Sequence, residues 1–488
     1  MADVPETRVR TIHAEPVRAD GSFVLYWMTA SRRVRWNFAL ERAVAWCRRL
    51  NRPLVILETL EAARRWSSLR HHQFVLEGML DNARRLRETN VLYYPFMATR
   101  PERVEGLLAA LVRSACLVVV DDAALFEQDL SPGAVCQHWP VTVEAVDSVG
   151  LMPMRIAEKA YPSASTMRRF LQKNLPDHLM NWPKRNPLAR VKLPQAEPLS
   201  EKIVQRWRPV NELLLDRLPK SSRRWAVDRS VEPVDTVGGS RAAERVLRRF
   251  VRSRLDDYTE QRNHPDEQAT SELAPYLHFG HVSSHQIFDA VARHDDWSPD
   301  RLGTRAAGQR EGWWGMSKSA EAFLDQLVTW RELGTNFCVL RSDHADYDSL
   351  PDWAKKTLAR HARDRREWVY SLEQFDRSAT HDPLWNAAQT QLVREGRMHN
   401  YLRMLWGKKI VEWSASPQDA LEVMIELNNR YALDGCDPNS YSGIFWVLGR
   451  YDRPFGPERD VFGKVRYMSS QNTAKKVRVK KYLACYGE

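Results

Sequence analysis

Three groups of residues in this 488-residue sequence have types and spacings that could bind a ligand. His281 and His285 lie four residues apart, as two metal ligands on one helical turn would. No HExxH glutamate and no third ligand accompany them, so the sequence does not predict a metal site. The run VGGS at 237–240 opens a helical pattern. It could cradle a phosphate, or it could be a flexible linker that ends in a serine N-cap.

The third group is aromatic and lies near the C-terminus. In REGRMHNYLRMLWGKKIVEW, Trp406 and Trp413 are seven residues apart. Two helical turns place them on one face, with about 10 Å of rise between them. Trp385, on the preceding segment, could pack beside them. Spacing alone favours an aromatic core stripe over a functional role.

Polar residues accompany this stripe. Arg403 lies among apolar neighbours near the middle of the same helical pattern, so burial would require a carboxylate, and Asp434 is a candidate. The next predicted helix begins with Ser416 as N-cap and Pro417 in its first turn. It ends near Asn428, whose amide could cap the helix, be exposed or face a ligand.

The elements that must position these residues divide the chain into parts. Short apolar runs separated by helical patterns predict a parallel, doubly wound α/β sheet; they lie at 23–27, 54–57, 91–94, 117–120 and 141–146. No GxGxxG follows the first run, so a dinucleotide site is disfavoured. From about residue 239 the pattern is helical and predicts a large all-α domain.

The boundaries follow from composition. Eight prolines between 175 and 235 predict an interdomain connector. We therefore expect a polar N-terminal extension, an α/β domain of Rossmann-like type, the connector and an all-helical domain, at 1–20, 21–174, 175–238 and 239–488 respectively.

Charge and cysteine content bound the partners and the compartment. The formal net charge is +11, which fits either general solubility or a polyanionic partner. Basic clusters with the look of phosphate-contacting surfaces lie at 223–229, 245–254 and 475–481. None of the six cysteines forms a CxxC pair, and no signal peptide or 18-residue apolar run is present. We expect a soluble cytoplasmic protein with no metal and no membrane contact.

Together the motifs resemble the class II cyclobutane pyrimidine dimer photolyases of the photolyase–cryptochrome superfamily. The matching segments run in the family's order from about residue 21 to 470: VLYWMTASRRVRWNFALERA, TSELAPYLHFGHVSS, WRELGTNFC, DYDSLPDWAKKTL, THDPLWNAAQ, MHNYLRMLWGKKIVEW, LNNRYALDGCDPNSYSGIFWVLG and GKVRYMS. The resemblance implies an α/β domain, an all-helical domain that holds FAD, and light-driven electron transfer from reduced, anionic FAD to a flipped-out dimer in double- or single-stranded DNA.

The resemblance also implies site residues. Those matching the flavin pocket are Tyr258, Thr270, Ser271, Leu273, Arg403, Asp434 and, facing flavin N5, Asn428. Those matching the electron relay are Trp406, nearest the ring, then Trp385, with Trp413 as a branch. Those matching the dimer pocket and the lesion strand are Trp330, Met404, Trp446, Arg453 and Arg466. Of the other tryptophans between 297 and 446, Trp297, Trp313, Trp314, Trp353 and Trp368 are expected only to pack.

One position departs from the family pattern. Many relatives carry a glutamate before WREL that can hydrogen-bond the thymine carbonyls, and Gln326 aligns with it here. Glutamine can donate a hydrogen bond but supplies no proton and no negative charge. A shift of one residue would place Asp325 in that role. Otherwise repair is slower, or the protein is a cryptochrome-like photoreceptor without repair activity.

Two further expectations complete the prediction. The α/β domain could hold a deazaflavin or folate antenna at its strand ends, or could be empty. We expect a monomer. A flavin-free, DNA-binding helical protein is a third hypothesis, and it predicts a colourless preparation.

Overall fold

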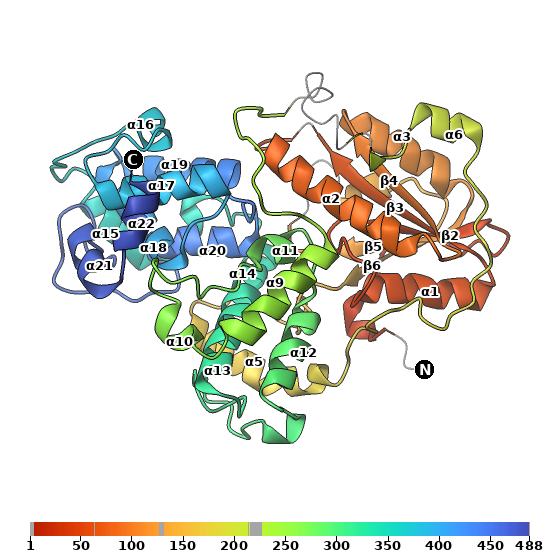
Figure 1. Cartoon of the computed structure of the whole chain (residues 1–488), viewed down its shortest axis with the longest axis horizontal. Coiled ribbons are helices and arrows are strands. Elements are labelled where there is room, and N and C mark those ends of the chain that lie inside the picture. The colour runs from red at the N-terminus through yellow and green to blue at the C-terminus, as the bar shows by residue number, and fades with distance from the viewer. Residues whose placement is uncertain (1–3, 63, 126–130, 213, 215–226, 488) are drawn as a thin grey trace. The chain divides into compact units, whose positions relative to one another are not determined.

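The computed structural model describes the chain except residues 1–3, 63, 126–130, 213, 215–226 and 488 (Figure 1). It divides into two compact units. The first contains Met1–Ile156, Leu175–Arg248 and Glu272–Val291, and the second contains Ala157–Asn174, Arg249–Ser271 and Ala292–Glu488. No helix among the described residues is long and apolar enough to cross a membrane.

The first unit is built on a six-stranded sheet with the order β1-β6-β5-β2-β3-β4. Only β1 is antiparallel to its neighbour; the other pairs are parallel. The strands are β1 (Val9–His13), β2 (Phe23–Met28), β3 (Leu54–Glu61), β4 (Leu92–Ala98), β5 (Ala115–Asp122) and β6 (Val143–Asp147). The predicted doubly wound α/β sheet is confirmed, and β1 adds a strand inside the expected polar extension.

Helices cover both faces of this sheet (Figure 1). On one face, Leu107 and Leu111 of α3 (Pro101–Val112) pack in a core with Trp27. On the other face, Leu40 of α1 (Phe38–Leu50) packs with Tyr26. Because both faces are covered, the central strands are buried along their whole length, as their unbroken apolar runs predict.

The remaining helices connect the strands and the two parts of the sequence. Some belong to the first unit alone, and three run across a boundary between the units along the chain. They are α2 (Leu69–Leu86), α4 (Pro132–Val135), α6 (Glu201–Arg206), α11 (Ala274–His278), and the continuing helices α5 (Ala164–Leu179), α9 (Ser240–Ser253) and α12 (Ser284–His294). Between α5 and α9 the chain is mostly irregular where described, and Leu193 and Trp207 insert into the two sheet cores.

The second unit contains no named strand among its described residues. Its helices are α10 (Tyr258–Gln261), α13 (Lys318–Leu324), α14 (Arg331–Leu340), α15 (Asp352–Arg360), α16 (Leu372–Asp376), α17 (Pro383–Glu395), α18 (Asn400–Trp413), α19 (Pro417–Tyr431), α20 (Pro438–Val447), α21 (Ser470–Lys476) and α22 (Lys480–Tyr486). A π-helical turn, Asp325–Trp330, joins α13 to α14. The predicted all-helical part is confirmed.

Candidate functional site

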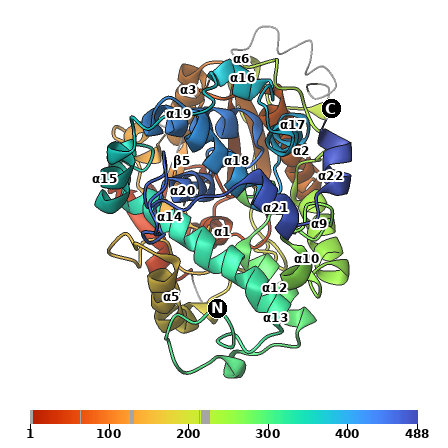
Figure 2. The same ribbon diagram turned by 90° about the vertical axis from the view of Figure 1, so that its left-hand side faces the viewer.

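Helix α18 lies at the centre of the candidate site, in contact with α17, α19 and α20 (Figure 2). Gly407 permits this close packing. A Cβ atom there would lie 2.6 Å from Cγ2 of Val447 on α20 and 3.1 Å from Sδ of Met424 on α19. Side chains that leave α18 in different directions therefore reach different neighbouring helices.

The three tryptophans predicted to form a relay are buried and connected with one another. Trp385, Trp406 and Trp413 are 0%, 2% and 3% exposed. The indole N–H of Trp385 donates to the backbone carbonyl of Trp406 at 3.0 Å, and the Trp385 and Trp413 rings lie 6.1 Å apart. Trp385 thus contacts both of the others. The indole N–H of Trp406 donates to Oε1 of Gln389 at 2.9 Å, a contact that sequence reasoning missed.

The residues at the two ends of α17 set the limits of the helix that carries Trp385. Asp382 is the N-cap of α17, and its Oδ1 accepts hydrogen bonds from the backbone N–H groups of Leu384 and Trp385, both at 3.0 Å. At the end of α17, Gly396 adopts a left-handed conformation with φ of 68°, which glycine reaches without steric cost. The sequence HDPLW therefore fixes where the helix begins and where Trp385 lies.

The ion pair expected between Arg403 and Asp434 is present. The two guanidinium N–H groups donate to the two carboxylate oxygens at 3.1 and 3.4 Å, and both side chains are partly buried. This bidentate arrangement fixes the plane of the guanidinium group. Asp434 is held in turn, because its carbonyl accepts a hydrogen bond from the Ser440 hydroxyl at 2.7 Å.

Asn428 lies on α19, one of the helices that pack against α18. It is 3% exposed, and its Nδ2 donates to Oδ1 of Asn429 at 3.0 Å. The same Oδ1 accepts from the Cys436 backbone N–H at 2.9 Å, which ties the loop after α19 to the helix. The Asn428 amide is therefore held in place inside the unit rather than exposed at a helix end.

Four further residues were predicted for the flavin pocket: Tyr258, Thr270, Ser271 and Leu273. Tyr258 is 7% exposed and packs edge-on against Phe250 and Phe323, with ring centroids 5.8 and 5.5 Å away. Burial raises the pKa of its hydroxyl. The Thr270 carbonyl accepts from the Arg254 guanidinium at 3.1 Å. Thr270 and Ser271 belong to the second unit, whereas the buried Leu273 belongs to the first.

Gln326 and Trp330 lie on the π-helical turn, and both are partly buried. The neighbouring Asp325 forms a bidentate ion pair with Arg168, with N–O distances of 2.8 and 3.2 Å. Its negative charge is thereby matched by an arginine. A π-helical turn holds one more residue than an α-helical turn and often marks a functional site.

Trp446 lies between two basic side chains. The Nζ of Lys408 lies 5.0 Å from the centroid of its ring, and the Cζ of Arg466 lies 5.8 Å away. Arg466 also pairs with Asp452 at 2.9 Å. Met404 is one helical turn from Lys408 on α18, so these two side chains share a helix face.

Arg453 lies on the same loop and is exposed. The guanidinium groups of Arg453 and Arg466 both lie over the ring of Phe455, at 5.6 and 4.4 Å from its centroid. Two exposed arginines therefore stand beside one aromatic ring, close to the Trp446 ring that Arg466 also contacts. Such a surface can contact both the phosphates and the bases of a nucleic acid.

Lys408 is a second residue that sequence reasoning missed. Its side chain is 0% exposed, and its ammonium group donates to the Val447 carbonyl at 2.5 Å. No carboxylate lies within ion-pair distance of it in the described part of the chain. Its pKa is lowered from 10.5 to about 7, mainly by burial and to a lesser degree by the nearby Arg466, while Asp452 opposes the change. Lys408 is the first of the two adjacent lysines in WGKK; both are buried, and only the fold shows that, among the described residues, Lys409 has a carboxylate partner while Lys408 does not.

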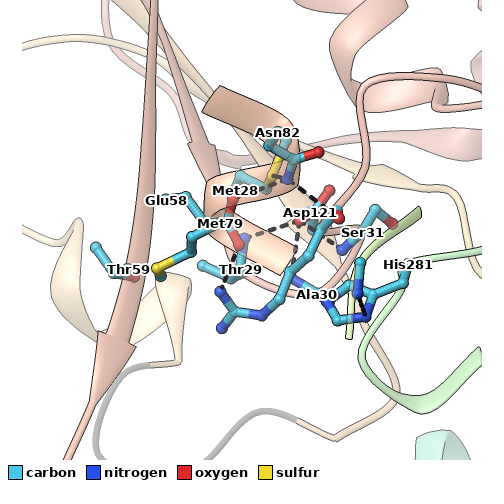
Figure 3. Close-up of polar contacts among 12 residues, drawn as sticks. Met28, Thr29, Ala30, Ser31, Glu58, Thr59, Met79, Asn82, Asp121 and His281 are labelled. Carbon is cyan, nitrogen blue, oxygen red and sulfur yellow. Dashed lines mark hydrogen bonds and ion pairs between the residues drawn. The ribbon is translucent and has the colours of Figure 1, made fainter. Parts of the chain in front are cut away.

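The first unit contains a network of buried acids at the carboxyl ends of its strands (Figure 3). Oδ2 of Asp121 accepts three backbone N–H groups, from residues 29, 30 and 31, at 2.8 to 2.9 Å. Glu58 accepts hydrogen bonds from Asn82 and Tyr93 and pairs with Arg32 at 3.2 Å. Asp121 and Glu58 are both 0% exposed, and their carboxylates accept hydrogen bonds from the protein's own donors.

The His281–His285 pair and the VGGS run at 237–240, which the sequence offered as possible ligand sites, have structural roles. The Gly239 backbone N–H donates to Nδ1 of His281 at 3.0 Å, and the Gly238 N–H donates to Glu77 at 2.6 Å. These amide groups therefore have protein acceptors rather than a phosphate. His285 packs between the rings of Phe38 and Trp182. The two histidines make separate structural contacts.

The basic clusters are described only in part. Arg245, Arg248 and Arg252 on α9 are exposed, as are the lysines of the cluster at 475–481. Most of the cluster at 223–229 lies outside the described residues.

Comparison with known proteins places this architecture in a family. No family model matches the chain. The deoxyribodipyrimidine photo-lyase of Methanothermobacter thermautotrophicus is 32% identical over 481 residues, which cover 98% of this chain and 97% of the relative. The enzyme of the same name from Potorous tridactylus is 33% identical over 485 residues, covering 97% and 83%.

Solved structures share the fold at lower sequence identity. A bacterial class III photolyase from Agrobacterium tumefaciens aligns with a TM-score of 0.68 at 17% identity, covering 96% of this chain and 86% of that one. An archaeal photolyase from Sulfolobus tokodaii, solved with two FAD molecules, aligns with a TM-score of 0.64 at 14% identity, covering 96% and 90%. These similarities support the two-part architecture.

An α/β unit and a helical unit with a buried tryptophan group define a protein of the photolyase–cryptochrome superfamily. The full-length similarity goes further: the chain belongs to the deoxyribodipyrimidine photo-lyase family. The prediction that it is an enzyme of this kind is confirmed.

Proposed function

We propose that this chain is a class II photolyase that uses light and FAD to split cyclobutane pyrimidine dimers in DNA. The observation that carries the proposal is the buried Trp385–Trp406–Trp413 group, two members of which share α18 with Arg403 of the Arg403–Asp434 ion pair. It occurs in a chain that is related over nearly its full length to deoxyribodipyrimidine photo-lyases. The class II assignment rests on the motifs quoted from the sequence.

The chemistry of the side chains fits a flavin. A flavin ring presents carbonyl oxygens and ring nitrogens, and Arg403, Asp434 and Asn428 offer a cation, a carboxylate and a neutral amide. A neutral amide facing N5 can hydrogen-bond the ring in more than one redox state. Tyr258, Thr270, Ser271 and Leu273 are the proposed contacts to the remainder of the cofactor. When bound, fully reduced, anionic FAD supplies the photoexcited electron for ring splitting and receives it back.

In this proposal the tryptophans bring electrons in from the surface. Trp406 is placed nearest the cofactor because it lies three residues from Arg403 on α18, whereas Trp413 lies at the end of that helix. Trp385 contacts both Trp406 and Trp413, so it is the middle member. Their burial excludes water from the path, and their contacts with one another keep each transfer step short.

The dimer would lie against Trp330, Met404 and Trp446. Enzymes that act on a base within DNA, photolyases among them, extrude it from the stack. Flat and polarizable side chains suit an extruded, stacked pair of bases. Arg453 and Arg466 would contact the phosphates of the lesion strand, and Gln326 would hydrogen-bond the thymine carbonyls. The ion pair of Asp325 with Arg168 supports Gln326, rather than Asp325, in this role.

Gln326 also supports a second candidate, a cryptochrome-like photoreceptor without repair. A glutamine cannot supply the negative charge or proton of the family's glutamate. The retained aromatic and arginine side chains around Trp446 support repair instead.

We propose an antenna chromophore, a deazaflavin or a folate, only at strand ends of the sheet that lie away from Asp121 and Glu58. Asp121 and Glu58 have their hydrogen bonds within the protein, so a chromophore would lie against other side chains. An absorption spectrum of the purified protein, compared with that of flavin alone, tests this directly.

The decisive test incubates the photoreduced protein with an oligonucleotide that contains one dimer, in blue light and in darkness. The proposal predicts loss of the dimer in light alone. A flavin-containing protein that leaves the dimer intact in light would establish the photoreceptor alternative, and a colourless preparation would exclude both.

A further inference from the structure

The tryptophan group continues outward into a stack of rings that the sequence did not reveal. The rings of Trp368 and His381 lie 4.7 Å apart, and those of Tyr370 and His381 lie 6.0 Å apart, each pair 23° from parallel. Trp413 adjoins this stack, with its ring 4.9 Å from His381 and 5.8 Å from Tyr370. We call Trp368, Tyr370 and His381 the outer stack.

The outer stack is tied to the relay by the backbone. The Tyr370 N–H donates to the Trp413 carbonyl at 3.0 Å, which fixes the tyrosine beside the end of α18. His381 directly precedes Asp382, the N-cap whose carboxylate sets the start of the helix that carries Trp385. Tyr370 and His381 are therefore positioned by the same turns that position Trp413 and Trp385.

A hydrogen bond joins the phenol of Tyr370 to the imidazole of His381. The hydroxyl oxygen lies 2.7 Å from Nδ1 of His381, and it also accepts the backbone N–H of His381 at 3.0 Å. When Nδ1 carries no proton, which is the tautomer the proposal requires, the hydroxyl donates its proton to Nδ1. The phenol thus has a base at hydrogen-bond distance and a donor aimed at the oxygen that would lose the proton.

Exposure distinguishes the outer stack from the relay. Trp368 is 43% exposed, whereas Trp413 is 3% exposed. The sequence predicted that Trp368 only packs, but its ring stacks over His381 at the surface. The outer stack is the place where the buried aromatic path meets solvent.

We propose that Tyr370 and His381 form a proton-coupled end of the tryptophan relay, with Trp368 as a positioning residue that holds the imidazole. This proposal rests on the proposed function, because it needs the relay to deliver an electron inward. It adds Tyr370 as the residue that reduces the oxidised tryptophan, and His381 as the residue that accepts the proton.

The step balances within the named residues. After light has drawn one electron inward, Trp413 carries a radical cation. Tyr370 gives one electron to Trp413, its O–H bond breaks, and a new N–H bond forms at Nδ1 of His381. Trp413 returns to its neutral form, Tyr370 becomes a neutral phenoxyl radical and His381 becomes an imidazolium. A soluble thiolate then gives one electron to the phenoxyl radical and becomes a thiyl radical, and the imidazolium of His381 returns its proton to the phenol.

The physical consequence is that positive charge leaves the buried path. A radical cation on a buried tryptophan attracts the departed electron strongly, because a protein interior screens charge poorly. An imidazolium at the surface is solvated by water. Moving the charge from Trp413 to His381 therefore slows the return of the electron and gives the thiol time to react.

The test uses the full-length protein with bound oxidised flavin and detects radicals by transient absorption and electron paramagnetic resonance after a light flash. We expect a tyrosyl signal in the unaltered protein, formed more slowly in D₂O. Tyr370→Phe should abolish this signal and shorten the lifetime of the tryptophan radical. His381→Phe, which keeps an aromatic ring but removes the proton acceptor, should abolish it as well.

A matched control and a second readout keep the test specific. Tyr467→Phe alters another tyrosine whose ring lies near Lys409 and should leave the signal unchanged. In the ¹⁵N-histidine spectrum of the protein without flavin, Tyr370→Phe should shift the Nδ1 resonance of His381. If tryptophan radicals form but no tyrosyl radical follows, or if Tyr370→Phe keeps the tyrosyl signal, the proton-coupled pair is wrong. If no radical forms at all, the relay itself is wrong.

Discussion

Replacing the buried Lys408 with methionine is expected to stabilise the protein at neutral and acidic pH. The ammonium group is 0% exposed, donates to the Val447 carbonyl and has no carboxylate at ion-pair distance in the described chain. Methionine has a similar length and no charge, so Lys408→Met removes the electrostatic cost and keeps most of the packing.

The magnitude follows from the pKa. Burial lowers the pKa of Lys408 from 10.5 to about 7, which corresponds to about 5 kcal/mol at about 1.4 kcal/mol per pH unit. The lost hydrogen bond and the lost cation–π contact with Trp446 offset about 2 kcal/mol of this. We therefore expect Lys408→Met to raise the free energy of unfolding by about 2–3 kcal/mol at pH 6.

The pH dependence has a definite sign. Between pH 7 and 10.5 the unfolded chain binds a proton at Lys408 that the folded chain lacks, so the stability contributed by this position rises with pH. Below pH 7 the lysine is charged in both states and the full cost is present. The advantage of the methionine variant should therefore shrink above pH 7 and disappear near pH 10.

Urea unfolding followed by tryptophan fluorescence measures both effects. Lys409→Met is the matched control: its ammonium group pairs with Glu412 at 2.6 Å, so its loss should lower stability rather than raise it. We also expect Lys408→Met to weaken binding of dimer-containing DNA, since the lysine contacts the Trp446 ring. A less stable Lys408→Met variant at pH 6, or an advantage that does not change with pH, would refute this reasoning.

Three further predictions address the proposed roles. Trp406→Phe should abolish photoreduction of the flavin while repair by chemically reduced enzyme survives, and normal photoreduction would disprove the relay order. Asp434→Asn should leave the Arg403 guanidinium without its carboxylate and lower flavin affinity about tenfold, measured as the flavin-to-protein ratio after dialysis. Gln326→Glu should raise the yield of dimer splitting per absorbed photon, and an unchanged yield would show that this position does not contact the dimer.

Much of the fold could be predicted because burial leaves a direct pattern in the sequence. The apolar runs ending at residues such as Trp27 and Val120 mark strands buried on both faces. The strand Val9–His13 was missed, since it pairs with β6 alone and alternates with charged and polar residues. This edge strand therefore lacks the unbroken apolar signal.

The site was predictable only where a physical requirement links two residues. A partly buried Arg403 needs a carboxylate, and this requirement pointed to Asp434. Nothing in the sequence requires Tyr370 and His381 to meet, because their contact depends on how the loop before α17 turns back over Trp413. The burial of Lys408 beside the ion-paired Lys409 depends likewise on which helix face meets α20.

The central claim is that light drives a catalytic dimer-splitting cycle in which the electron returns. The most direct measurement counts dimers lost per protein molecule under blue light, starting from fully reduced protein with no further reductant added. The account predicts many dimers repaired per protein molecule and none in darkness. Loss of no more than one dimer per molecule, or equal loss in light and darkness, would contradict it.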